Sequence, residues 1–203
     1  MSNSESGNAT RQRPRVEGDR EEEILQATVM VLAELGYDRL TMDAVASAAK
    51  ASKATLYRRW STKAELVVDA ISRAKDCQPT SADTGSLRGD LLEMSCGDGG
   101  FTDEMPMSVM AGLMTALHRD DDLQAAFHKI FLTPRISAVN EVYTRAMDRG
   151  EIAAGVDVEL LCQALPALMI YNAFVLGNQP DDSMIRRVID NLILPATRGS
   201  RES

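Results

Sequence analysis

The sequence predicts an all-α protein with about nine helices, because apolar residues recur at helical spacing along most of the chain. Alternating Val, Ile and Thr runs bounded by hairpin turns, which would indicate strands, are nearly absent. Residues that cap helices also stand in front of several apolar stretches. The chain has 203 residues and 44% are hydrophobic, which is enough to build a core.

The N-terminal third predicts four helices. Residues 1–18 lack an apolar segment, so we expect a disordered arm rather than a secretory signal. An acid-rich start leads into the first helix, which Gly36 ends. Thr41 and Ser52 cap two short helices, and Thr62 with Glu65 forms the capping box of a fourth. The expected ranges are 19–35, 42–49, 53–60 and 63–77.

The rest of the chain predicts five further helices. Residues 78–86, "QPTSADTGS", have the composition of a linker. Pro134 should kink the longest helix. The expected helices span 87–96, 107–117, 123–148, 158–176 and 181–193. We therefore expect an arm (1–18), a small N-terminal domain (19–65) and a larger C-terminal domain (66–198).

Charge is distributed unevenly. Residues 1–65 hold 10 basic and 10 acidic residues, whereas the remainder holds 12 and 20, and the whole chain carries a formal charge of -8. Between Ala44 and Ala64 there are five basic residues and no acidic one. Such a basic window can bind phosphate locally, because salt confines electrostatic fields to about 8 Å at physiological ionic strength.

Three short helices joined by tight turns within 19–60 have the spacing of a helix-turn-helix, whose second helix crosses the DNA backbone while the third enters the major groove. Hydroxyls and cations at the helix starts can then meet phosphates and base edges. The alternative is that the charges only form a solvated face. The candidate DNA-binding residues are Thr41, Ser52, Lys53, Ala54, Thr55, Tyr57, Arg58 and Lys63.

The window "TMDAVASAAKASKATLYRRWSTKAEL" (41–66) resembles the TetR family of bacterial transcriptional repressors, whose pattern runs approximately "T…IA..AGVS.GTLY.HF..KE.L". The upstream "ILQATVMVLAELGYDRLTM" is similar to the family's "IL.AA..LF.E.GY..TT", so the resemblance covers residues 20–70. Three departures stand out. Lys50 replaces a glycine that tolerates positive φ, Ala54 replaces another glycine, and Arg58, Arg59 and Trp60 replace "x-His-Phe".

The resemblance implies a homodimer with an N-terminal DNA-binding domain, a C-terminal domain that binds a small ligand, and dimerisation through the last two helices. It favours repression over activation. The apo dimer would bind a (pseudo)palindromic operator with recognition helices about 34–36 Å apart. Ligand binding would favour another separation and release the DNA.

Abundant methionine, 11 residues in all, favours an adaptable apolar cavity. Ordinary core packing is the alternative for each residue. The effector is expected to be hydrophobic. The candidate ligand-binding residues are Met94, Met107, Met110, Met114, Phe127, Phe131, Met169 and Phe174.

The segment "VELLCQALPALMIYNAFVL" is apolar on more than one face, which indicates burial against both the domain core and a partner. A monomeric core is the alternative. The candidate dimer residues are Leu161, Leu165, Leu168, Met184, Val188 and Leu192.

Other classes of function find little support. Only two histidines, His118 and His128, could serve a triad, and "GDGG" lacks the lysine of a phosphate loop. We expect no enzyme activity, no cofactor and no metal site. The three dispersed cysteines indicate reduced thiols. The sequence contains no stretch of about 18 uninterrupted apolar residues, which a membrane span would require. We therefore expect a cytoplasmic protein, with a helical protein-interaction module that does not bind DNA as the alternative.

Overall fold

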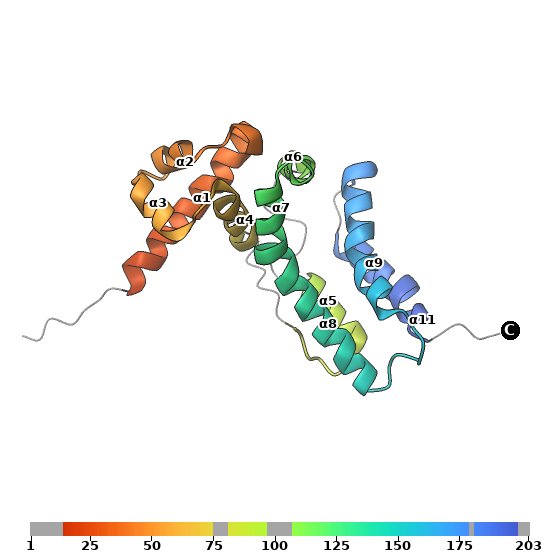
Figure 1. Ribbon diagram of the computed structural model, residues 1–203. Coiled ribbons are helices and arrows are strands. Elements are labelled where there is room, and N and C mark those ends of the chain that lie inside the picture. The colour runs from red at the N-terminus through yellow and green to blue at the C-terminus, as the bar shows by residue number, and fades with distance from the viewer. Residues whose placement is uncertain (1–13, 75–80, 97–106, 179–180, 199–203) are drawn as a thin grey trace, which may run out of the picture.

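The computed structural model describes residues 14–74, 81–96, 107–178 and 181–198, and within these ranges it contains helices and no strand. The described residues form nine helices, as the sequence predicts, three of which contain a π-helical stretch (Figure 1). The elements are α1 (Pro14–Arg39), α2 (Met42–Ala48), α3 (Lys53–Arg59), α4 (Lys63–Ala74), α5 (Leu87–Cys96), α6 (Met107–Leu117), α7–η1–α8 (Asp121–Ala126, Phe127–Leu132, Thr133–Asp148), α9–η2 (Val158–Ile170, Tyr171–Val175) and α10–η3–α11 (Asp182–Val188, Ile189–Ile193, Leu194–Ala196).

Helix α1 begins earlier than the sequence predicts. The expected arm reached residue 18, whereas the helix starts at Pro14. Proline is favoured at the first position of a helix, because its missing N–H has no partner there and its φ is already helical. Residues 1–13, including Arg11 and Arg13, lie outside the described residues. Near its other end α1 breaks at Gly36, whose φ of 73° only glycine adopts readily.

The long helix in the middle of the molecule absorbs its proline with a π-helical stretch. Asp120 caps α7 by accepting a hydrogen bond from the N–H of Leu123 at 2.9 Å. The π-helical residues of η1 lie directly before α8, in which Pro134 occupies the first turn. A π-stretch leaves room for a residue without an N–H, so the chain continues as one helix past the predicted kink.

Two hydrophobic clusters form the core of the described residues. The first cluster contains residues of α1 to α4 together with Val109 and Leu113 of α6 and Leu123 of α7. The second contains residues of α5, α8, α9, α10 and η3. Helices α1 to α3 thus share one core with α4, α6 and α7, because α4 buries Leu66, Val67 and Ile71 against them.

Figure 1 shows the consequence for the overall shape. Helices α1 to α4 lie at one end, α7–η1–α8 runs along the middle, and α9 and α10–α11 lie on the opposite side from the N-terminal helices. The stretch Val158–Val175 is long and apolar enough to cross a membrane by length and composition, and 17% of it is buried within the chain. One such helix is weak evidence for a membrane span, since other helices with apolar faces pass the same test.

Candidate nucleic-acid interface

Helix α3 places its first turn outward and anchors its other side in the core. The Ser52 hydroxyl caps the helix by accepting a hydrogen bond from the N–H of Thr55 at 3.1 Å, and it lies 2.8 Å from the Thr55 hydroxyl. Leu56 is fully buried, whereas Lys53, Ala54 and Tyr57 are exposed. The predicted base-facing residues therefore lie together on the exposed side of α3, and Arg58 is exposed in its last turn.

The turn between α2 and α3 contains Lys50, which replaces the glycine of the family pattern. Lys50 adopts a φ of 49°, the left-handed region that costs an L-residue roughly 1–2 kcal/mol. Two backbone hydrogen bonds hold the turn, from Lys50 N to Ser47 O at 3.1 Å and from Ala51 N to Ala46 O at 2.8 Å. A guanidinium nitrogen of Arg20 also donates to the Lys50 carbonyl at 2.6 Å. This hydrogen bond from α1 could not be predicted from the sequence, because thirty residues separate the two partners.

The start of α2 combines a cap with a charge pair. The Thr41 hydroxyl accepts from the N–H of Ala44 at 3.1 Å, so this exposed candidate phosphate ligand already serves as the helix cap. Asp43, in the first turn, lies 2.7 Å from the Lys53 ammonium at the start of α3. Hydrogen bonding to Asp43 raises the pKa of Lys53, which therefore stays protonated. Sequence reasoning missed Asp43, which lies one residue before the acid-free window.

Lys63, the last candidate phosphate ligand, is half-buried at the start of α4. Its ammonium group donates to the Tyr37 carbonyl at 3.2 Å and lies 4.2 Å from the centre of the Tyr37 ring. The Tyr37 hydroxyl in turn donates to Asp120, the cap of α7, at 2.9 Å. Burial and this hydrogen bond raise the pKa of Tyr37. Lys63 thus sits at the junction of α1, α4 and α7 rather than free on the surface.

Arg59 completes the set of cations in the basic window. Its guanidinium group lies 3.4 Å from Glu21 of α1, and Glu21 also pairs with Arg73 of α4 at 2.7 Å. The Glu21 side chain is only 22% exposed, so it ties the end of α3 to two other helices. The fold therefore brings to the basic window two acids, Asp43 and Glu21, that the linear sequence places outside it.

The candidate effector residues divide between the two clusters instead of forming one. Met110, Phe127 and Phe131 pack against the first cluster, and the two phenyl rings stack at 4.8 Å between centroids. Met94 packs against the second cluster, and Met169 is fully buried in it. Met114 is half-buried on α6, and the side chain of Met107 lies outside the described residues.

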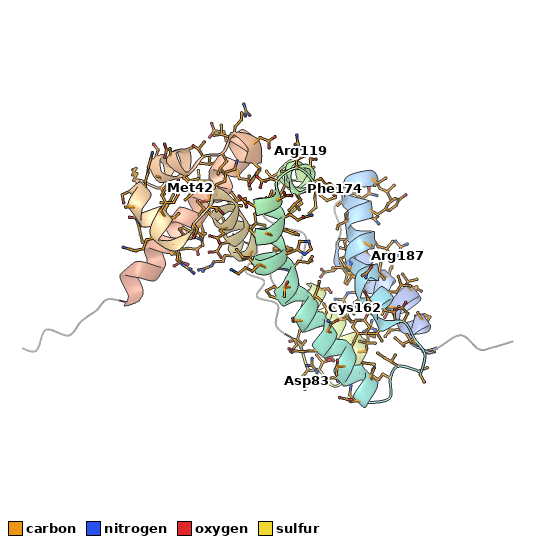
Figure 2. The ribbon with its side chains drawn as sticks, in the orientation of Figure 1. Met42, Asp83, Arg119, Cys162, Phe174 and Arg187 are labelled. Atoms are coloured by element: carbon orange, nitrogen blue, oxygen red, sulfur yellow. The ribbon has the colours of Figure 1, made fainter. Side chains whose placement is uncertain are left out.

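Phe174 belongs to η2, which contacts α6. Figure 2 shows Phe174 on the side of η2 nearest α6. The candidates thus do not form a single group, and Met169 belongs to the core of the second cluster.

The predicted dimer residues lie mostly on the inward sides of their helices. Leu161 is only 8% exposed and Val188 is also buried, both within the core of one chain. Leu165, Leu168 and Met184 are half-buried against the same cluster, and only Leu192 is exposed. The apolar side chains that α9, η2 and the residue after them present to the outside are Leu160, Ile170, Tyr171, Val175 and Leu176.

The reason for the difference is geometric. Successive residues of an α-helix point about 100° apart, since one turn contains 3.6 residues. A helix that is apolar on several faces does not reveal from its sequence which face meets its own core. The prediction selected the inward face of α9, and the outward face begins with the adjacent residue, Leu160.

Comparison with known proteins agrees with this architecture. Residues 24–70 match the family model of bacterial regulatory proteins of the tetR family, and residues 81–192 match the model of the tetracyclin repressor-like C-terminal domain. An HTH-type transcriptional regulator of Mycobacterium tuberculosis is 35% identical over 180 residues, which cover 87% of each chain. A DNA-binding transcriptional repressor TetR of Mycobacteroides abscessus is 34% identical over 177 residues, covering 86% of this chain and 92% of that one.

The crystal structure of the TetR family transcription regulator SCO0332 superposes with a TM-score of 0.63, at 26% identity, over 86% of this chain and 97% of that chain. The matches span both the helix-turn-helix and the C-terminal helices. The chain belongs to the TetR family and is a helix-turn-helix transcriptional regulator.

Proposed function

We propose that the protein is a repressor that binds a (pseudo)palindromic operator as a homodimer and releases it when a small apolar ligand binds the C-terminal domain. The observation that carries this proposal is α3, whose capped first turn presents Lys53 and Ala54 outward while Leu56 anchors the helix in the core. A relative is named as a repressor, which favours repression over activation.

A second copy of this chain is the occupant that best fits the exposed apolar stripe of α9 and η2. Val175 is 66% exposed and Leu160 is 62% exposed, which is costly for a lone chain. The stripe lies on helices that are far from α1 to α4 (Figure 1), so pairing through it leaves both recognition helices free. Two copies related by a twofold axis would read two half-sites of an operator.

Ligand control is supported by the shared core. Because α6 packs against α1, which packs against α2 in the same cluster, a displacement of α6 can reach the DNA-binding helices through α1. The Tyr37–Asp120 hydrogen bond adds a polar connection between α1 and the start of α7. A ligand that binds between α6 and η2, where Phe174 lies, would release DNA if it bound the low-affinity state more tightly.

The DNA-binding step can be tested with Ala54→Glu. The substitution puts a negative charge on the outward face of α3, where it would meet DNA, while an acid in the first turn of a helix favours folding. Its matched control is Ala125→Glu, at an exposed alanine of α7. Binding to duplexes from the DNA flanking the protein's own gene should be lost in the first variant and kept in the second. Equal binding by both variants would refute α3 as the reading helix.

The dimer can be tested with Val175→Glu, against Met30→Glu as a control at an exposed methionine of α1. Sedimentation equilibrium should give a dimer for the parent and for the control, and a monomer for Val175→Glu. A parent protein that stays monomeric at all concentrations would refute the proposed assembly.

The ligand step can be tested by titrating the operator complex with a series of apolar compounds. Phe174→Ala should weaken the response to any active compound without changing operator affinity in its absence. Operator affinity that no compound changes would refute ligand control.

A further inference from the structure

Lys53, the cation at the start of the recognition helix, already forms a salt bridge with Asp43 on the side predicted to face DNA. The Lys53 ammonium lies 2.7 Å from Asp43, which belongs to the first turn of α2. The two side chains are 62% and 61% exposed, so the pair sits in water beside the residues predicted to meet DNA. When Lys53 binds a phosphate, it must leave Asp43 or bring that negative charge against the DNA backbone.

The Lys53–Asp43 salt bridge differs from the one that Glu21 forms with Arg59 of the basic window. Glu21 is mostly buried and holds Arg59 and Arg73, so it joins three helices. An exposed lysine–aspartate pair, in contrast, contributes little to stability, because water screens the attraction and ordering both side chains costs entropy. A purely structural role therefore explains Glu21 much better than it explains Asp43.

We propose that Asp43 is a specificity-determining residue, which competes with phosphate for Lys53 and so weakens binding to DNA of arbitrary sequence. This inference rests on the assignment of α3 as the recognition helix. Binding to arbitrary DNA depends almost wholly on cations that neutralise phosphates. A lysine held by an aspartate adds no net charge to that attraction. At an operator, hydrogen bonds to base edges can compensate for breaking the pair, whereas arbitrary DNA offers no such contacts.

The test uses Asp43→Asn, with Asp43→Ser as a second neutral variant. Both residues are accepted near a helix start. Asp148→Asn is the matched control, because it makes the same change at an exposed aspartate of α8 in the second half of the molecule. The probes are a random-sequence duplex and an operator duplex of equal length, titrated by fluorescence anisotropy across salt concentrations from about 50 to about 200 mM.

For the random duplex, the slope of log affinity against log salt should steepen by about 0.9 in the Asp43 variants, the value for one additional phosphate contact. Affinity for this duplex should rise on the order of fivefold at low salt, and affinity for the operator should rise less. The ratio of the two affinities would then fall. In a Lys53→Gln background the effect of Asp43→Asn should become much smaller, because the competing cation is gone.

Three outcomes would overturn the inference. The Asp43 variants could bind the random duplex with the slope and affinity of the parent protein. Their gain could persist undiminished with Lys53→Gln, which would indicate a general charge effect, or Asp148→Asn could give an equal gain. If the parent selects its operator but any of these results is found, the role of Asp43 is refuted and the regulator assignment stands. A parent that binds neither duplex at any salt concentration refutes both.

Discussion

The hydrogen bond from Tyr37 to Asp120 should connect the stability of the DNA-binding helices to that of the C-terminal domain. It joins the end of α1 to the cap of α7 at 2.9 Å, across 83 residues of sequence. Tyr37 is only 5% exposed, and its ring and carbonyl both support Lys63 at the start of α4. Tyr37→Phe removes the hydroxyl and keeps the ring, so the perturbation is confined to this bond.

The magnitude follows from the surroundings of the bond. A hydrogen bond to a charged group contributes about 1.5–3 kcal/mol. Asp120 is only half-buried, and it keeps its hydrogen bond from Leu123 in the variant, so the lower end applies. We therefore expect a loss of about 1.5 kcal/mol in the free energy of unfolding, which lowers the midpoint by about 3–6 °C in a chain of this size.

The assay uses Trp60, the single tryptophan of the chain, which is buried in the first cluster. Its fluorescence reports unfolding of the DNA-binding helices, whereas circular dichroism reports all helices. In Tyr37→Phe both transitions should move to lower temperature, with the fluorescence transition moving at least as far, at fixed protein concentration.

The control is Tyr143→Phe, because the Tyr143 hydroxyl donates at 3.4 Å to Leu161 within the second cluster. It should affect the circular dichroism transition at least as much as the fluorescence transition. An unchanged fluorescence midpoint in Tyr37→Phe, or an equal shift in both variants, would refute the connection through Asp120.

Two further predictions concern the same helices. The hydrogen bond from the Leu123 N–H, followed by that from Tyr37, lowers the pKa of Asp120, so its contribution is present above the unfolded value of about 3.9 and is lost as pH falls through the folded pKa. The difference between parent and Tyr37→Phe should therefore shrink in urea titrations below about pH 4, and a constant difference would contradict this. Lys50→Gly relieves a left-handed backbone but adds unfolded-state entropy, so urea unfolding should show a net gain of about 0.5–1 kcal/mol, and a loss of stability would contradict the strain.

Local features of the DNA-binding helices could be predicted from the sequence. The caps at Thr41 and Ser52 depend on residues three positions away, and both form as expected. At the start of α4 the Thr62 hydroxyl accepts from the N–H of Glu65 at 3.1 Å, as expected, whereas the Glu65 carboxylate accepts from the N–H of Ser61, one residue before the cap, at 2.8 Å. Such motifs are readable because the whole interaction lies within one helical turn.

Features that depend on the meeting of distant segments could not be predicted in this way. Nothing in the sequence of α1 indicates that Arg20 would donate to the turn at Lys50, or that Tyr37 would reach Asp120. The outward face of α9 was likewise undetermined, because several of its faces are apolar. Tertiary packing decides which apolar face of a helix is buried, and helical periodicity alone cannot distinguish between several apolar faces.

The contrast between an acidic chain and its basic window now has a physical account. Three of the five cations of the window are held by partners from other segments, Lys53 by Asp43, Arg59 by Glu21 and Lys63 by the Tyr37 carbonyl. Attraction to DNA is thus reduced before any contact forms, and binding must draw more on the base-facing surface of α3. Since that helix shares its core with α6 and α7, a small displacement in the C-terminal domain can shift the balance between bound and free operator.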